Sequence, residues 1–127
     1  MTQEQKELLL KDLCGRLPYG VKVQTTYINP QTKERKDIGT DVLSTVEISM
    51  LIDGYEEHKP YLFPLTSMSD EQKVIYGDLC YAIIHSLAWD MQAALNELVD
   101  WLNEIHFDYN NLIPMDLAID ATGLNIY

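Results

Sequence analysis

Apolar residues recur at helical spacing through most of the C-terminal half of this chain. Over residues 75–105 they follow one another every three or four positions with almost no interruption. Ser69 and Gln72 form a capping box just before this pattern and so mark a helix start. One helix over this length would span about 55 Å at about 1.5 Å per residue, too long for a compact domain of this size. We therefore expect two helices, with a break near Trp89 and with Asp90 capping the second.

The N-terminal part predicts a helix followed by a strand. Thr2 and Gln5 form another capping box, and apolar residues at helical spacing follow until the chain reaches Gly15 and Pro18. Over residues 21–27 the apolar and polar side chains alternate instead, which is typical of a half-buried strand.

Three further segments carry β-type patterns. Residues 42–52 are predicted as a strand whose even-numbered side chains face the core and whose odd-numbered side chains face water. The charged segment 33–37 is either an exposed edge strand or a loop. The run 61–63 lies between prolines and suits an edge strand or an extended covering segment.

These elements predict a single α+β domain over residues 1–127. We expect an N-terminal helix, a small and mostly antiparallel sheet of three to four strands, and two C-terminal helices packed on one face of the sheet. The 46% of apolar residues is sufficient for one core. No run approaches the ~20 apolar residues of a membrane span, and the polar N-terminus lacks a signal region, so we expect a cytoplasmic protein.

Charge is distributed unevenly along the chain. The 54 residues after Lys73 contain no Lys or Arg, yet the net charge of the whole chain is -11. A surface without cations cannot neutralise phosphates, which argues against nucleic acid and anionic membranes as partners of this half. A cation or a basic protein stays possible. The acids in this region are Asp78, Asp90, Glu97, Asp100, Glu104, Asp108, Asp116 and Asp120.

The second C-terminal helix carries the candidate interaction residues. Glu97, Asp100 and Glu104 are spaced i, i+3 and i+7, which places three carboxylates on one helical face. They could meet a basic partner or a hard cation, or they form an ordinary solvated face. Trp101 and Tyr109 lie nearby and serve either as core or as part of a partner-binding patch.

Signals for catalysis are missing from the sequence. His58, His85 and His106 have no metal-ligand spacing, the serines lack a nucleophile-elbow context, and the glycines form no phosphate-binding cluster. We therefore expect no catalytic residues, no metal and no cofactor.

Both ends of the chain and part of its middle resemble one protein family. Residues 100–109 and 112–121 are similar to the C-terminal signature of a family of small uncharacterised proteins from gut anaerobes, their phages and mobile elements. Residues 8–14, 17–22 and 60–65 resemble it as well. Where that family tends to have Arg-Gly, this chain has Asn110-Asn111, which argues against a cation there. The resemblance implies an accessory protein and nominates no catalytic residues.

Three functions are consistent with these observations. The first is a non-catalytic interaction protein of a phage or mobile element, with a protein partner of basic character; association with further copies of the chain stays open. The second is an acidic inhibitor that imitates nucleic acid and occupies a DNA-binding protein. The third is a small hydrolase whose site is assembled only in the fold.

Overall fold

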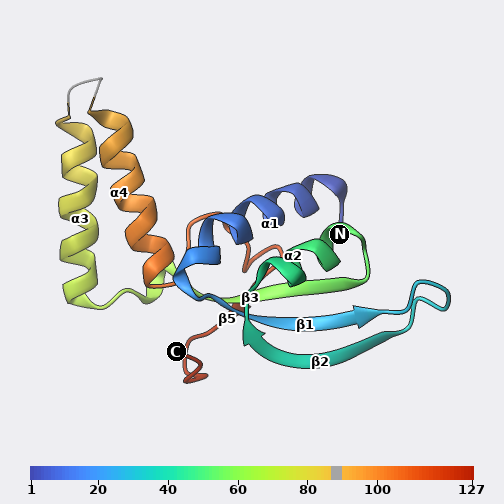
Figure 1. Ribbon diagram of the computed structural model, residues 1–127. Helices are drawn as coiled ribbons and strands as arrows, with labels where there is room; N and C mark the ends of the chain where they lie inside the picture. The colour runs from blue at the N-terminus through green and yellow to red at the C-terminus, as the bar shows by residue number, and fades with distance from the viewer. Residues whose placement is uncertain (87–89) are drawn as a thin grey trace.

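The computed structural model describes residues 1–86 and 90–127 and has an α+β fold (Figure 1). Helices and strands are interspersed in the first half, and a pair of helices follows. In chain order the elements are α1 (Gln3–Arg16), β1 (Lys22–Ile28), β2 (Arg35–Val42), α2 (Thr45–Ile52), β3 (Glu56–Pro64), α3 (Asp70–Ile84), α4 (Met91–Glu104), β4 (Phe107–Asp108) and β5 (Ile119–Asp120), with short 3-10 turns at Leu17–Tyr19 and Leu65–Ser67.

The strands form a mixed five-stranded sheet in which β3 is central. β1 pairs antiparallel with β2 on one side and with the first half of β3 on the other. The second half of β3 pairs in parallel with the short strands β4 and β5. Pro60 lies at the change of partner, since pairing with β1 ends at Pro60 and pairing with β5 begins at Tyr61. Proline lacks the N–H that a continuous ladder would need there.

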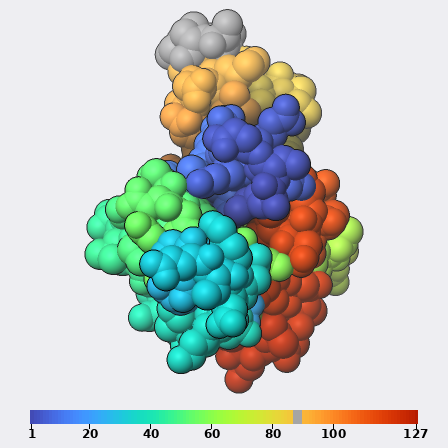
Figure 2. All heavy atoms as spheres, turned by 90° about the vertical axis from the view of Figure 1, so that its right-hand side faces the viewer, coloured from blue at the N-terminus to red at the C-terminus, as the bar shows by residue number. Residues whose placement is uncertain are grey.

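Helices α1 and α2 cover one face of this sheet (Figure 1). Seen from the right-hand side of that view, α1 lies between α2 and the C-terminal segment (Figure 2). The main core lies in this layer, where the apolar faces of the two helices meet β1, β3 and the C-terminal segment. Its buried members are Leu9, Leu13, Val21, Val23, Leu43, Leu51, Leu62, Leu112, Leu117 and Ala118.

The strand predicted over residues 42–52 is wrong, because most of this segment is helix α2. Ser44 and Glu47 form a capping box that starts the helix. Leu51 is buried and Ile48 is half-buried, whereas Val46 is 68% exposed. The alternating pattern is therefore incidental, and burial follows the helical spacing instead.

Two other expectations about strands are resolved by the structure. Residues 35–37 of the charged segment belong to β2, an edge strand whose residues are all exposed. The run 61–63 belongs to β3, so its expected position at an edge is wrong. The flanking prolines are tolerated because β3 exchanges neighbours between its two halves.

The predicted division into two C-terminal helices is confirmed. Asp90 is the N-cap residue of α4, but its side chain makes no capping hydrogen bond, and Trp89 lies outside the described residues. The two helices do not lie on the sheet face as expected. They form an antiparallel hairpin that projects from the rest of the fold (Figures 1 and 2), and we call this hairpin the arm.

Candidate functional site

The arm is attached to the rest of the protein mainly at its base. Ser69 and Gln72 cap α3 reciprocally, with N–O distances of 3.1 and 2.9 Å. No residue of α3 is fully buried, and α4 buries only Leu102 and Asn103 in its last turn. An element that buries so little apolar surface draws little stability from the main core. The arm is thus exposed to contact by other molecules along most of its length.

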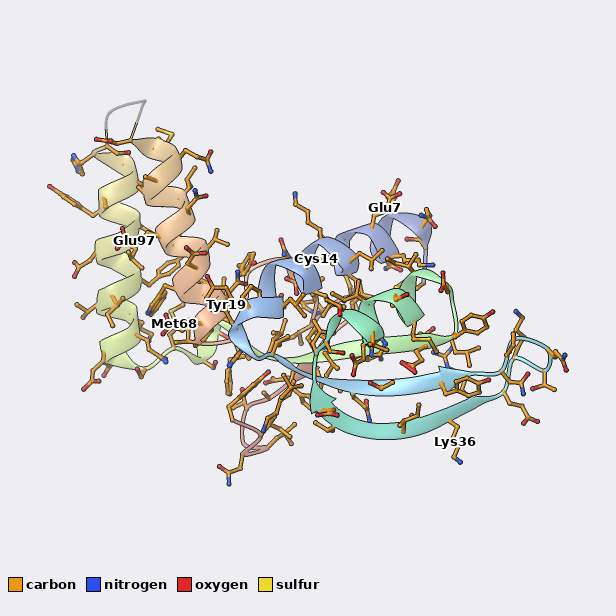
Figure 3. The ribbon with its side chains drawn as sticks, viewed as in Figure 1. Glu7, Cys14, Tyr19, Lys36, Met68 and Glu97 are labelled. Atoms are coloured by element: carbon orange, nitrogen blue, oxygen red, sulfur yellow. The ribbon has the colours of Figure 1, made fainter. Side chains whose placement is uncertain are left out.

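A second, smaller core cluster joins the arm to the sheet. Met68, Leu102 and Phe107 are its buried members, and Trp101 is one of the half-buried side chains packed against them. Met68 and Tyr19 lie near this base in Figure 3. Trp101 therefore contributes to the core with one part of its indole ring and remains partly exposed with another.

An open groove runs between the two helices of the arm, and it contains the three carboxylates that the sequence places on one face. Ile75 and Leu79 of α3 line one side of the groove. The α4 side combines apolar and acidic residues: Ala93, Asn96, Glu97, Asp100, Trp101 and Glu104. The predicted common face of Glu97, Asp100 and Glu104 is confirmed, and the structure adds the apolar residues beside them.

The negative charge of this groove is not neutralised within the described part of the chain. None of the ion pairs found there includes Glu97, Asp100 or Glu104. The Tyr19 hydroxyl donates a hydrogen bond of 2.9 Å to Asp100, and this bond raises the pKa of Tyr19. A neutral donor satisfies one carboxylate oxygen but leaves the charge in place, so the groove attracts cationic groups.

Tyr109, the fifth candidate residue, does not line the groove. Its ring packs against the second core cluster, and its hydroxyl donates to the Asn103 side chain at 2.7 Å. The Arg16 guanidinium lies 4.7 Å from the ring centroid, as in a cation–π contact. Burial raises the pKa of the Tyr109 hydroxyl. The structure thus joins four of the five candidates in the groove and places Tyr109 in a polar network beneath the base of the arm.

That network is centred on a buried ion pair that sequence reasoning missed. Arg16 donates to both carboxylate oxygens of Asp12, at 2.7 and 3.1 Å, and both side chains are fully buried. Arg16 also donates to the Phe107 carbonyl at 2.8 Å, and Asn110 donates to Asp12 at 2.8 Å. The sequence contains a signal for the burial of this pair, because Asp12 and Arg16 lie on the same helical face as the apolar Leu9 and Leu13.

The arrangement around His58 bears on the hydrolase hypothesis. Thr25 Oγ1 lies 3.0 Å from His58 Nδ1, and Glu56 Oε1 lies 3.3 Å from His58 Nε2. A hydroxyl, an imidazole and a carboxylate are the groups of a hydrolytic triad. The residue is 0% exposed, however, and burial lowers the pKa of the imidazole although Glu56 opposes the shift. The ring has no exposed surface of its own, and Thr25 and His58 are direct partners in the ladder, so the geometry fits a packed cross-strand contact between β1 and β3.

The other two histidines lie in different places. His106 stacks on Tyr127, with ring centroids 3.8 Å apart, and His85 stands against Tyr81 at the end of α3. Across the described ranges 1–86 and 90–127, no group of three or more His, Cys, Asp or Glu side chains is arranged to hold a metal ion.

Comparison with models of known protein families, with curated proteins and with solved structures finds no match to this chain. Among the helices described, none is both long enough and apolar enough to cross a membrane.

Proposed function

We propose that this chain is a non-catalytic interaction protein that binds a basic protein partner through the groove of its arm. A single observation carries this proposal: a groove lined by apolar side chains and by three exposed carboxylates lies on a hairpin that projects away from the main core. The resemblance to proteins of phages and mobile elements supports an accessory role in such an element.

The groove offers the two ingredients of a protein-binding site. Ile75, Leu79 and Trp101 supply apolar surface that a partner side chain can bury. Glu97, Asp100 and Glu104 form a charged border that speeds association with a basic surface and disfavours acidic competitors. Together these features suit the recognition of an amphipathic helix that carries Lys or Arg along one border.

The test requires a partner and a defined groove variant. Affinity purification from the native cell, followed by mass spectrometry, supplies the partner. Association rates are then measured for the wild type and for the triple variant Glu97→Lys, Asp100→Lys, Glu104→Lys. We expect the variant to associate at least about tenfold more slowly, and we expect rising salt to slow the wild type in parallel.

A matched control distinguishes an effect of the groove carboxylates from an effect of the net charge. The triple variant Glu4→Lys, Glu7→Lys, Asp53→Lys makes the same change in net charge at exposed positions of α1 and the end of α2. It should associate at close to the wild-type rate. Equal slowing of both variants, or of neither, would contradict binding in the groove.

The same carboxylates favour a second candidate, an inhibitor that imitates nucleic acid. Glu97, Asp100 and Glu104 form an exposed acidic row in a region without Lys or Arg. A charge mimic would occupy the phosphate-binding surface of its partner, so double-stranded DNA should compete with this protein for that partner. Competition at physiological salt would favour this candidate, and simultaneous binding of DNA and protein would exclude it.

A further inference from the structure

The side chain of Tyr127 is inserted between two strands of the sheet. Its hydroxyl accepts a hydrogen bond of 2.9 Å from the Lys22 N–H and donates one of 2.8 Å to the Tyr61 carbonyl. Lys22 and Tyr61 would form the next pair of the β1–β3 ladder, which ends at Val23 and Pro60. The hydroxyl therefore takes the place of the direct hydrogen bonds that two antiparallel strands exchange, and it joins the two backbones.

Further contacts hold the ring and the carbonyl group before it. His106 stacks on the ring with centroids 3.8 Å apart, and the ring of Phe63 lies 6.0 Å away. The Lys22 ammonium donates a hydrogen bond of 2.7 Å to the Ile126 carbonyl and lies 5.9 Å from the Tyr127 ring centroid. Burial raises the pKa of Tyr127 to about 12, so the hydroxyl keeps the proton that it donates. We call the four residues that make these contacts the tyrosine socket: Lys22, Tyr61, Phe63 and His106.

Residues 122–127, which we call the strap, are attached to the fold mainly through this socket. The strap lies on the side of the sheet away from α1 and α2 (Figure 1). It borders a hollow of about 470 Å³ beside Phe63, and its Leu124 is 49% exposed. In the part of the chain that the structure describes, its only hydrogen bonds to distant residues are those with Lys22 and Tyr61. The position of the strap therefore depends on the socket.

The chemistry of the socket selects a ring with two polar features. A backbone N–H and a backbone carbonyl select a group that both accepts and donates, which a phenol does and a phenyl ring does not. The lysine ammonium selects a carbonyl group just before the ring, as in a peptide that contains tyrosine. Sites that bond a hydroxyl discriminate against the analogue without it, because their own polar groups are then left unpaired.

We propose that the tyrosine socket is a binding site for an acyl-tyrosyl unit, and that the strap fills this site as an internal ligand. A tyrosine-containing segment of a partner protein displaces the strap and makes the same contacts. The strap is tethered and so competes at a high effective concentration, which makes the site autoinhibited. The socket shares no residue with the groove of the arm, so this proposal does not depend on the proposed function.

The test removes the internal ligand and supplies it from solution. The probe is N-acetyl-tyrosinamide, whose acetyl carbonyl and phenol reproduce those of Ile126 and Tyr127. We expect Tyr127→Ala to bind the probe saturably, with a shift of the Lys22 amide signal in NMR spectra. The wild type should bind it at least about tenfold more weakly, because the strap occupies the socket. N-acetyl-phenylalaninamide, which lacks the hydroxyl, should bind Tyr127→Ala at least about tenfold more weakly than the probe.

A second variant tests the hydroxyl within the ladder. Tyr127→Phe keeps the ring but removes the bond to Lys22, so the Lys22 amide should exchange its hydrogen at least about tenfold faster than in the wild type. The Thr26 amide, further along the same ladder, is the control and should not change. Absent binding to Tyr127→Ala, equal binding by the wild type or of both probes, or an unchanged Lys22 amide would overturn the proposal. So would a Tyr127→Ala variant that fails to fold, because a ligand cannot displace a strap on which the fold depends.

Discussion

The buried Asp12–Arg16 pair fixes the end of α1 to the segment that follows the arm. Arg16 reaches the Phe107 carbonyl and Asp12 accepts from Asn110, so one ion pair joins two parts of the chain that are far apart in sequence. The loss of either partner would leave an unpaired charge in a fully buried site, and this costs more than the intact pair contributes.

We predict that Asp12→Ala lowers the free energy of unfolding by about 3 to 5 kcal/mol, because the Arg16 charge stays buried. The double variant Asp12→Leu, Arg16→Met removes both charges and should be more stable than Asp12→Ala alone. Urea unfolding curves provide the measurement, with the exposed Glu7→Ala as control at less than about 0.5 kcal/mol. A double variant less stable than the single one would show that Arg16 stabilises the fold even without Asp12, which would contradict the prediction.

His106 makes the stability depend on pH. Its ring is stacked on Tyr127, and burial together with the Arg16 and Lys22 cations lowers its pKa to about 4. The ordinary value of about 6.5 applies in the unfolded chain, which therefore takes up a proton first as the pH falls. The contribution of neutral His106 is complete above pH 6.5 and is lost progressively between pH 6.5 and 4.

We expect this residue to lower the free energy of unfolding of the wild type by about 1 kcal/mol between pH 7 and pH 5. This is less than the difference between the two pKa values gives in full, because solvent reaches part of the ring and screens the cations. His106→Asn should remove this part of the pH dependence. Asparagine tolerates the positive φ of 63° at this position, so the backbone need not change. Unfolding free energies of both proteins at the two pH values test this, and equal losses in both would contradict it.

At the scale of single elements, α2 shows how a short segment can satisfy two periodicities. The even-numbered apolar residues of 42–52 fit a strand, yet the Ser44 and Glu47 capping box fits a helix, and the helix is what forms. The two possibilities make opposite predictions for Val46, which is exposed on the helix but would face the core from a strand.

We therefore predict that Val46→Asp changes the unfolding free energy by less than about 0.5 kcal/mol. Leu51→Asp should unfold the protein, because Leu51 is 1% exposed and its replacement buries an unpaired carboxylate. Thermal melts followed by circular dichroism give the ranking of the two variants. The reverse ranking would restore the strand interpretation of this segment.

At the scale of the whole molecule, the protein has a well-packed body and a weakly buried arm. Val23 of β1 and Leu62 of β3 belong to the main core, and β3 also buries His58, Pro60 and Tyr61, whereas no residue of α3 is fully buried. Local opening free energies follow buried contacts, so the arm should open far more often than the sheet.

Hydrogen exchange should reveal this division of the molecule. In the wild type we expect the amides of α3 to exchange at least about tenfold faster than those of β1 and β3. Uniform protection of arm and sheet would show that the arm is as stable as the body.

Local signals within a few residues of each other predicted much of this protein correctly. The capping boxes at Thr2 and Ser69 mark the starts of α1 and α3, the alternation at 21–27 marks β1, and the spacing of the three carboxylates places them on one face of α4. These features depend on hydrogen bonds and side-chain directions that adjacent turns of backbone supply by themselves.

The tertiary structure alone decided the rest. The central position of β3, the burial of Asp12 with Arg16 and the projection of the arm away from the sheet all depend on segments brought together from distant parts of the chain. Other elements of the fold decide whether a helix face is buried. The spacing of the residues on that face does not indicate which elements will pack on it. For this reason the sequence predicts an acidic face on α4, and only the fold shows that an apolar groove lies beside it.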